Sequence, residues 1–170
     1  MRAWLMAALI GLACLPLFAA ELELTIEVPK MNVAEYHRPY VAVWVERSDG
    51  TIAANLAVWH AMATRDRDGT RWLEDLRQWW RRGGRDVRMP VDVVSGATRA
   101  PGRHRLAFGS SNGLLASLAA GAYRLTIEAA REVGGREMLQ VPFTWPPERA
   151  ISATAVGRTE LGSVTLSLRP

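Results

Sequence analysis

The sequence predicts a mainly β fold, an antiparallel immunoglobulin-like β-sandwich with one inserted α-helix at about residues 70–82. Two observations support this prediction. Several short segments alternate apolar and polar residues with a period of two, and turn signals rich in glycine separate them. Only one segment has apolar residues at helical spacing instead.

The N-terminal half contains three of the alternating segments. Asp49-Gly50 separates the second segment from the third, and this dipeptide is typical of a hairpin turn. We therefore expect a β-hairpin centred on it. The apolar positions of the three expected strands are Leu22, Leu24, Ile26 and Val28, then Val41, Val43 and Val45, then Ile52, Ala54, Leu56 and Val58.

The C-terminal half contains three more alternating segments. Gly134-Gly135 lies between the first two of them and predicts a second hairpin. The last segment ends close to the C-terminus. The apolar positions are Tyr123, Leu125, Ile127 and Ala129, then Leu139, Val141 and Phe143, then Val164, Leu166 and Leu168.

The segment with helical spacing covers about residues 70–82. Thr70 suits the N-cap position, and Gly83-Gly84 suits the end of the helix. We expect this helix to pack across an edge or end of one sheet. Its apolar face comprises Trp72, Leu73, Leu76, Trp79 and Trp80.

The first 19 residues have the features of a secretory signal peptide. Met1-Arg2 is a short positive end, residues 3–18 are almost wholly apolar, and Leu17-Phe18-Ala19 fits a small-residue cleavage site. We therefore expect a signal peptide at residues 1–19 and a single β-sandwich domain at residues 20–170, exported to the periplasm. The apolar stretch is too short for a stable membrane span. A lipoprotein signal acylated at Cys14 is the alternative.

The composition limits the classes of function. Cys14 is the only cysteine, so the mature chain has no disulfide and no thiolate metal site. The net charge is +4 and the pI about 10.0, but the arginines are dispersed and no nucleic-acid partner is expected. The three histidines match no ligand motif, so no metal site is predicted.

One short run carries a possible chemistry. Its sequence is Asp92-Val93-Val94-Ser95-Gly96-Ala97-Thr98. This run resembles the site at which bacterial flavin transferases attach FMN to threonine, a pattern of Asp, two variable residues, Ser or Thr, Gly, Ala and the acceptor Thr. The resemblance implies that Thr98 carries FMN through a phosphoester bond, and it assigns Asp92, Ser95, Gly96 and Ala97 to the same cofactor site.

The residue types suit this chemistry. The acceptor hydroxyl of Thr98 would attack the pyrophosphate of FAD, and small residues at Gly96 and Ala97 let the backbone approach a phosphate closely. Asp92 would support either metal or base chemistry in the complex with the transferase. The alternative interpretation is an ordinary loop between two strands.

The resemblance extends beyond this run to nearly the whole mature chain. The chain is similar to one family of predicted periplasmic bacterial proteins of the domain-of-unknown-function type. The resemblance implies export, and it implies a flavin transferase of the ApbE type and a PepSY-type membrane reductase as partners in extracytoplasmic electron transfer. The segments that carry it are residues 37–44, Trp72-Leu73, Trp79-Trp80-Arg81, residues 94–102, Gly121-Ala122-Tyr123, residues 128–132 and Glu160-Leu161-Gly162.

The sequence thus favours a non-catalytic electron carrier that is itself the substrate of an FMN transferase. Ser95 lacks the Gly-x-Ser-x-Gly context of many hydrolases, and no local signature proposes another enzyme class. The alternative is a cofactor-free β-sandwich that acts as a binding or scaffold protein in the periplasm.

Several residues near the run in sequence are candidates for the same site. Trp79 and Trp80 are expected to be core residues, because large aromatic side chains at helical spacing usually pack inside; the alternative is that the outward member of the pair stacks on the flavin. His104, six residues after Thr98, is the histidine closest in sequence. The arginines that flank the run are Arg88, Arg99 and Arg103, and the preferred interpretation is that all three are solvated. A surface ion pair is expected among Glu128, Arg131 and Glu132.

Overall fold

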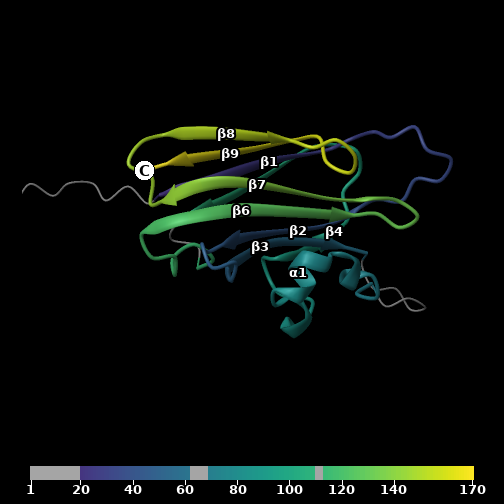
Figure 1. Cartoon of the computed structure of the whole chain (residues 1–170), viewed down its shortest axis with the longest axis horizontal. Helices are drawn as coiled ribbons and strands as arrows, with labels where there is room; N and C mark the ends of the chain where they lie inside the picture. Colours follow the sequence, from purple (N-terminus) through teal and green to yellow (C-terminus); the bar gives the residue numbers. More distant parts are fainter. Residues whose placement is uncertain (1–19, 62–68, 110–112) are drawn as a thin grey trace, which may run out of the picture.

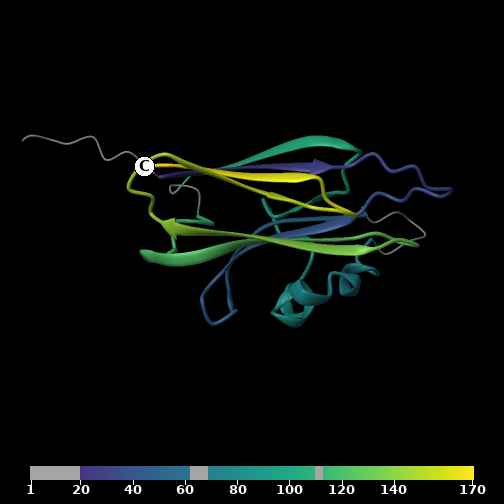
Figure 2. The same cartoon turned by 45° about the horizontal axis from the view of Figure 1, so that its top comes forward.

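The computed structural model describes residues 20–61, 69–109 and 113–170. Two β-sheets pack face to face, and the short helical segment lies outside them, on the five-stranded sheet (Figure 1). The view turned by 45° shows the same two layers (Figure 2). The mainly β sandwich with one inserted α-helix is therefore confirmed, whereas the expected signal peptide at residues 1–19 lies outside the described residues.

The first sheet has four strands in the order β5-β1-β9-β8. All three pairings in it are antiparallel, with Leu24 opposite Leu106 of β5 and Leu166 of β9. The bounds of its strands are β1 Glu21–Val28, β5 Gly102–Gly109, β8 Ile151–Val156 and β9 Ser163–Arg169.

The second sheet has five strands in the order β4-β3-β2-β6-β7. Four of them form antiparallel neighbours, and the short edge strand β4 pairs in parallel with the end of β3. The bounds are β2 Tyr40–Glu46, β3 Ile52–His60, β4 Ser95–Ala97, β6 Gly121–Ala130 and β7 Arg136–Trp145.

The alternating apolar residues form the core between the two sheets. The side chains that β1 and β2 place in this buried cluster are almost or wholly inaccessible to solvent, as period-two alternation requires when one face of each strand is covered. Its members from these strands are Leu22, Leu24, Ile26, Val28, Val41, Val43 and Val45.

Six predicted strands are confirmed, and three strands were missed. β5 carries Arg103, His104 and Arg105, and only one of its residues, Phe108, is buried. β8 is an edge strand whose Ile151 and Val156 are exposed, so neither strand has the apolar face that the sequence pattern detects. β4 has three residues, too few for any periodicity.

The predicted helix at residues 70–82 is wrong in length. The α-helix α1 covers only Arg77–Arg81, with short 3₁₀ turns at Leu73–Asp75 and Gly84–Asp86. Leu76 interrupts the helical path because its ψ angle is 67°. The chain turns at this point so that Leu73, Leu76 and Trp79 all become buried in a second cluster on the outer face of the five-stranded sheet, together with Trp44 and Val58.

The start of α1 is determined by a distant carboxylate. Glu128 of β6 is fully buried and accepts hydrogen bonds from the backbone N–H groups of Gln78 and Trp79, the latter at 2.9 Å. Thr70 as the N-cap is therefore wrong, since the residue preceding α1 is Leu76. The predicted end is confirmed, because the helix stops before Gly83, which has a φ of 143°. Within the described residues, no helix is long and apolar enough to cross a membrane.

Candidate functional site

The run from Asp92 to Thr98 lies at one edge of the five-stranded sheet. Ser95–Ala97 form β4, which is paired with Val58, Trp59 and His60 of β3. The backbone N–H of Thr98 donates to the carbonyl of His60 at 3.1 Å. The expectation of a plain loop is therefore wrong for residues 95–97, because β3 extends far enough to offer this segment an unpaired edge.

A tight turn precedes the strand and is held at both ends. The N–H of Ser95 donates to the carbonyl of Val91 at 2.8 Å, and the N–H of Val91 donates to Oγ of Ser95 at 2.7 Å. Val93, at the tip of this turn, has a φ of 68° and is 83% exposed. A β-branched residue is strained in this conformation, so the two hydrogen bonds stabilise a turn that Val93 itself disfavours.

The five predicted site residues differ in exposure and in bonding. Asp92 and Ala97 are exposed, and Ser95, Gly96 and Thr98 are half-buried. The Ser95 hydroxyl is engaged with Val91 and with the sulfur of Met89 at 3.7 Å. The Thr98 hydroxyl and the Asp92 carboxylate have no hydrogen-bond partner in the part of the chain that the structure describes.

The fold itself does not require a glycine at position 96. A Cβ there would lie 3.5 Å from Cδ1 of Trp59, which is an ordinary van der Waals contact, and the φ of Gly96 is not positive. Within the described part of the chain, the missing side chain therefore serves no packing purpose. Close approach of an external group remains the use of glycine that this position can satisfy.

The aromatic residue beneath the run is Trp59, which sequence analysis did not single out. Its ring lies 5.6 Å from the His104 ring in an edge-to-face arrangement, and the guanidinium of Arg99 lies 5.5 Å from its centroid. Nε2 of His104 lies 2.8 Å from the carbonyl oxygen of Ala100. Trp59 was missed because the register shift between β2 and β3 turns it into the core, whereas simple alternation places it on the same side as Asn55.

Trp79 and Trp80 belong to the packing on the outer face of the five-stranded sheet, as expected for aromatic residues at helical spacing. Trp79 is fully buried, and its indole N–H donates to Oδ1 of Asn55 at 2.8 Å. Trp80 is half-buried beside it, with 6.3 Å between the two ring centroids. Trp80 is thus the outward member of the pair.

A buried ion pair ties the two sheets together at the same end of the sandwich. Arg131 follows β6 and pairs with Glu160 of the β8–β9 turn at 2.9 Å, and both side chains are nearly inaccessible to solvent. The carboxylate of Glu160 also accepts the N–H of Gly135 at 2.7 Å. The predicted surface ion pair among Glu128, Arg131 and Glu132 is therefore wrong, because Arg131 pairs with a residue from the other sheet.

Glu137 of β7 makes a second tie between the sheets. Its carboxylate accepts hydrogen bonds from four successive backbone N–H groups of the β8–β9 turn, at residues 158–161. Burial acts to raise the pKa of Glu137, but these four donors outweigh it, so the pKa lies below its ordinary value. Among the described residues, no group of three or more His, Asp or Glu side chains is placed to hold a metal ion.

A family match emerges when the chain is compared with protein-family models. The model of a predicted periplasmic protein family, DUF2271, matches residues 21–163. The chain belongs to this family. No curated protein and no solved structure matches the chain.

The DUF2271 match begins with β1 and ends at the first residue of β9, so it includes the five-stranded sheet, the other three strands of the four-stranded sheet, α1 and the whole run from Asp92 to Thr98. The description of the family as periplasmic agrees with the export expected from the N-terminal sequence. The site described above is therefore part of the DUF2271 unit and not an appendage to it.

Proposed function

We propose that this DUF2271 protein is a periplasmic electron carrier to which an FMN transferase of the ApbE type attaches FMN at Thr98. One observation supports this assignment above the others. Of the two hydroxyls in the run, that of Ser95 is engaged in holding the turn, and that of Thr98 makes no hydrogen bond among the described residues. The available nucleophile is therefore the residue at the acceptor position of the pattern.

The proposed attachment is a phosphoryl transfer from FAD. The Thr98 oxygen forms a new bond to the phosphorus of the FMN half, and the pyrophosphate bond to that phosphorus breaks. AMP leaves with the bridging oxygen, and the hydroxyl proton passes to a base in the transferase complex. The product is FMN joined to Thr98 by a phosphodiester that retains one negative charge.

The edge position of the run favours access by a second enzyme. β4 is three residues long and occupies the outer edge of its sheet, and Asp92 and Val93 before it are exposed. The exposure of Asp92 supports a contribution of its carboxylate to the complex with the transferase. The proposed electron donor is a PepSY-type membrane reductase, an assignment that rests on the family resemblance.

Mass spectrometry tests the attachment directly. Protein co-expressed with an ApbE-type transferase should gain the mass of FMN less one water, and Thr98→Ala should abolish the gain. Thr98→Ser should retain it, because the hydroxyl is preserved. The matched control is Thr159→Ala, an exposed threonine of the β8–β9 turn, which should be modified as fully as the wild type. An unchanged mass in the presence of an active transferase would refute the proposal.

The second candidate is a cofactor-free binding or scaffold protein. The pairing of β4 with β3 favours it, because edge pairing alone gives residues 95–97 a structural role. Under this function neither the wild type nor Thr98→Ala would gain mass on co-expression with the transferase.

A further inference from the structure

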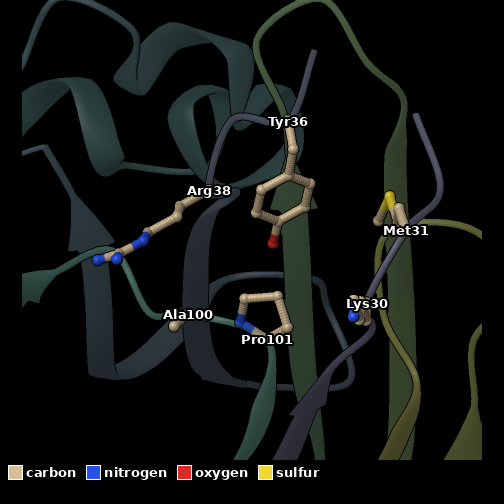
Figure 3. A pocket seen from close by; sticks show the side chains of 6 residues that line it. All are labelled: Lys30, Met31, Tyr36, Arg38, Ala100 and Pro101. Carbon is tan, nitrogen blue, oxygen red and sulfur yellow. The ribbon is translucent and has the colours of Figure 1, made fainter. Parts of the chain in front are cut away.

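A pocket lies directly beyond the proposed attachment site. Residues 29–39 and residues 98–101 both cross from one sheet to the other at this end of the sandwich, since β1 and β5 belong to one sheet and β2 and β4 to the other. The pocket lies between these two crossings, and its volume is about 360 Å³. Its lining residues are Lys30, Met31, Tyr36, Arg38, Ala100 and Pro101 (Figure 3).

The pocket contains a buried hydroxyl without a partner. The Tyr36 hydroxyl is inaccessible to solvent and makes no hydrogen bond to any of the described residues, and Figure 3 shows it directed toward Pro101. Burial raises the pKa of the Tyr36 phenol, although the charges of Arg131 and Arg38 act in the opposite direction. The phenol is therefore a neutral O–H donor at neutral pH. An unpaired buried donor costs free energy that a ligand with an acceptor would recover.

The remaining lining residues specify the kind of ligand. The Tyr36 ring, Met31 and Pro101 offer apolar surface, and Lys30 and Arg38 supply N–H donors on either side of it (Figure 3). None of the six lining residues is acidic. This combination suits a flat ring system with an apolar end and an edge of hydrogen-bond acceptors. The volume lies at the small end of the range for ligand pockets, about 300–1,000 Å³, which suits one ring system and not a whole dinucleotide.

Thr98 lies within reach of this pocket. Ala100 is only two residues further along the chain, so the two Cα atoms are at most about 7.6 Å apart. The ribityl chain of FMN spans the step from a phosphate on Thr98 to a ring held beside Ala100. The carbonyl oxygens and ring nitrogens of isoalloxazine form one acceptor-rich edge, and its dimethylbenzene end is apolar.

We propose that this pocket seats the isoalloxazine ring of the FMN carried by Thr98, with the Tyr36 hydroxyl donating to its acceptor edge and Met31 and Pro101 covering its apolar part. This inference rests on the attachment proposed above. It adds the residues that hold the ring, none of which belongs to the acceptor run.

The test uses the full chain co-expressed with the transferase and measures two quantities in order. The intact mass shows whether FMN is attached. The fluorescence of the attached flavin, its anisotropy and its quenching by iodide then show where the ring lies. A tyrosine in contact with isoalloxazine quenches its fluorescence by electron transfer, whereas a phenylalanine does not. We therefore expect weak, highly anisotropic and iodide-resistant emission from the wild type.

Two variants probe the pocket, each with a matched control. Tyr36→Phe should raise the emission several-fold without changing the mass gained from FMN, and Lys30→Met should lower the anisotropy and increase iodide quenching. Tyr123→Phe removes the hydroxyl of a tyrosine whose donor bond goes to Ala119, and Arg149→Met removes an exposed cation at the other end of β8 from the pocket. Both controls should match the wild type.

The outcomes separate the two proposals. If no FMN is attached to the wild type, the attachment and the pocket assignment both fail. The pocket assignment alone is wrong if FMN is attached but its emission has low anisotropy and is quenched by iodide. It is also wrong if the emission does not respond to Tyr36→Phe and Lys30→Met. Because the two variants alter different sides of the pocket, misfolding of one of them leaves the other as the test.

Discussion

The hydroxyl of Ser95 accepts the backbone N–H of Val91 at 2.7 Å, while the hydroxyl of Thr98, three residues later, has no such bond among the described residues. The run therefore contains one hydroxyl that stabilises the local backbone and one that does not. The turn at residues 91–95 is closed by Ser95, whereas Thr98 follows the edge strand with its hydroxyl unbonded among the described residues. The two hydroxyl residues of the run therefore differ in their contacts.

Ser95→Ala should lower the free energy of unfolding without preventing attachment. The variant leaves the Val91 N–H without its acceptor, at a cost of about 1 kcal/mol. Urea denaturation of the unmodified protein measures this cost, and intact mass after co-expression measures attachment. Ser152→Ala is the control, since its exposed hydroxyl contacts only Ser167 at 3.4 Å and its loss should be neutral. Equal costs for the two variants would argue against a closing role for Ser95.

Val93→Asn should stabilise the protein. Val93 occupies the left-handed region at a φ of 68°, where a β-branched residue is strained and asparagine is tolerated. Because Val93 is 83% exposed, the exchange loses little burial, and the gain in unfolding free energy should be about 1 kcal/mol. Thermal and urea denaturation provide the measurement.

Val156→Asn is the control for this exchange. Val156 is also exposed but ends the regular strand β8, where asparagine is disfavoured. It should therefore lose stability under the same conditions. A loss of stability in Val93→Asn as well would show that the turn does not strain Val93.

The strands that cover the core could be predicted from the sequence, whereas the edge strands β4 and β8 could not. β1, β2 and β6 have one fully covered face, so their alternation records their burial directly. Ile151 and Val156 of β8 are exposed at a sheet edge, and β4 depends on the unpaired end of β3. Pairing of this kind is a tertiary property that no local pattern carries.

The candidate site was predictable as a motif but not as a location. The types of Asp92 and Thr98 are visible in the sequence, whereas the position of Trp59 beneath the run depends on a bulge between β2 and β3. The contacts of Tyr36 depend on two crossing segments more than 60 residues apart. These contacts are set by the sheet order, which local spacing does not encode.

Glu128→Ala should destabilise the protein by about 3 kcal/mol, because it removes the acceptor for the N–H groups of Gln78 and Trp79 at the start of α1. Glu128→Gln keeps one acceptor oxygen, so its loss should be smaller. Urea denaturation monitored by tryptophan fluorescence measures the change in the free energy of unfolding, since Trp79 of this helix is buried. The control Glu132→Ala removes an exposed carboxylate in the turn between β6 and β7, and it should leave the free energy of unfolding nearly unchanged. Stability of Glu128→Ala equal to that of the control would show that α1 does not need the carboxylate.

Glu137→Gln should reduce stability at neutral pH more than in acid. The four backbone donors of residues 158–161 hold the pKa of Glu137 below its ordinary value in the folded protein. In the unfolded chain the pKa returns to about 4.3. The stabilisation is therefore fully present above pH 4.3 and is lost as the pH falls through the lower, folded pKa, because the unfolded state then binds the additional proton.

The expected cost of Glu137→Gln at pH 7 is about 2 kcal/mol, from the charge-assisted hydrogen bonds that an amide only partly replaces. Urea denaturation at pH 7 and pH 3 should show the difference from the wild type shrinking in acid, and the acid decline of the variant should be shallower. The variant should still lose some stability in acid, because three other carboxylates have pKa values below their ordinary range. These are Glu27, Glu46 and Asp49. Glu148→Gln, at an exposed position, should run parallel to the wild type at both pH values. A constant difference between Glu137→Gln and the wild type would mean that the carboxylate charge contributes nothing, and that the tie between the two sheets depends on the shape of the side chain alone.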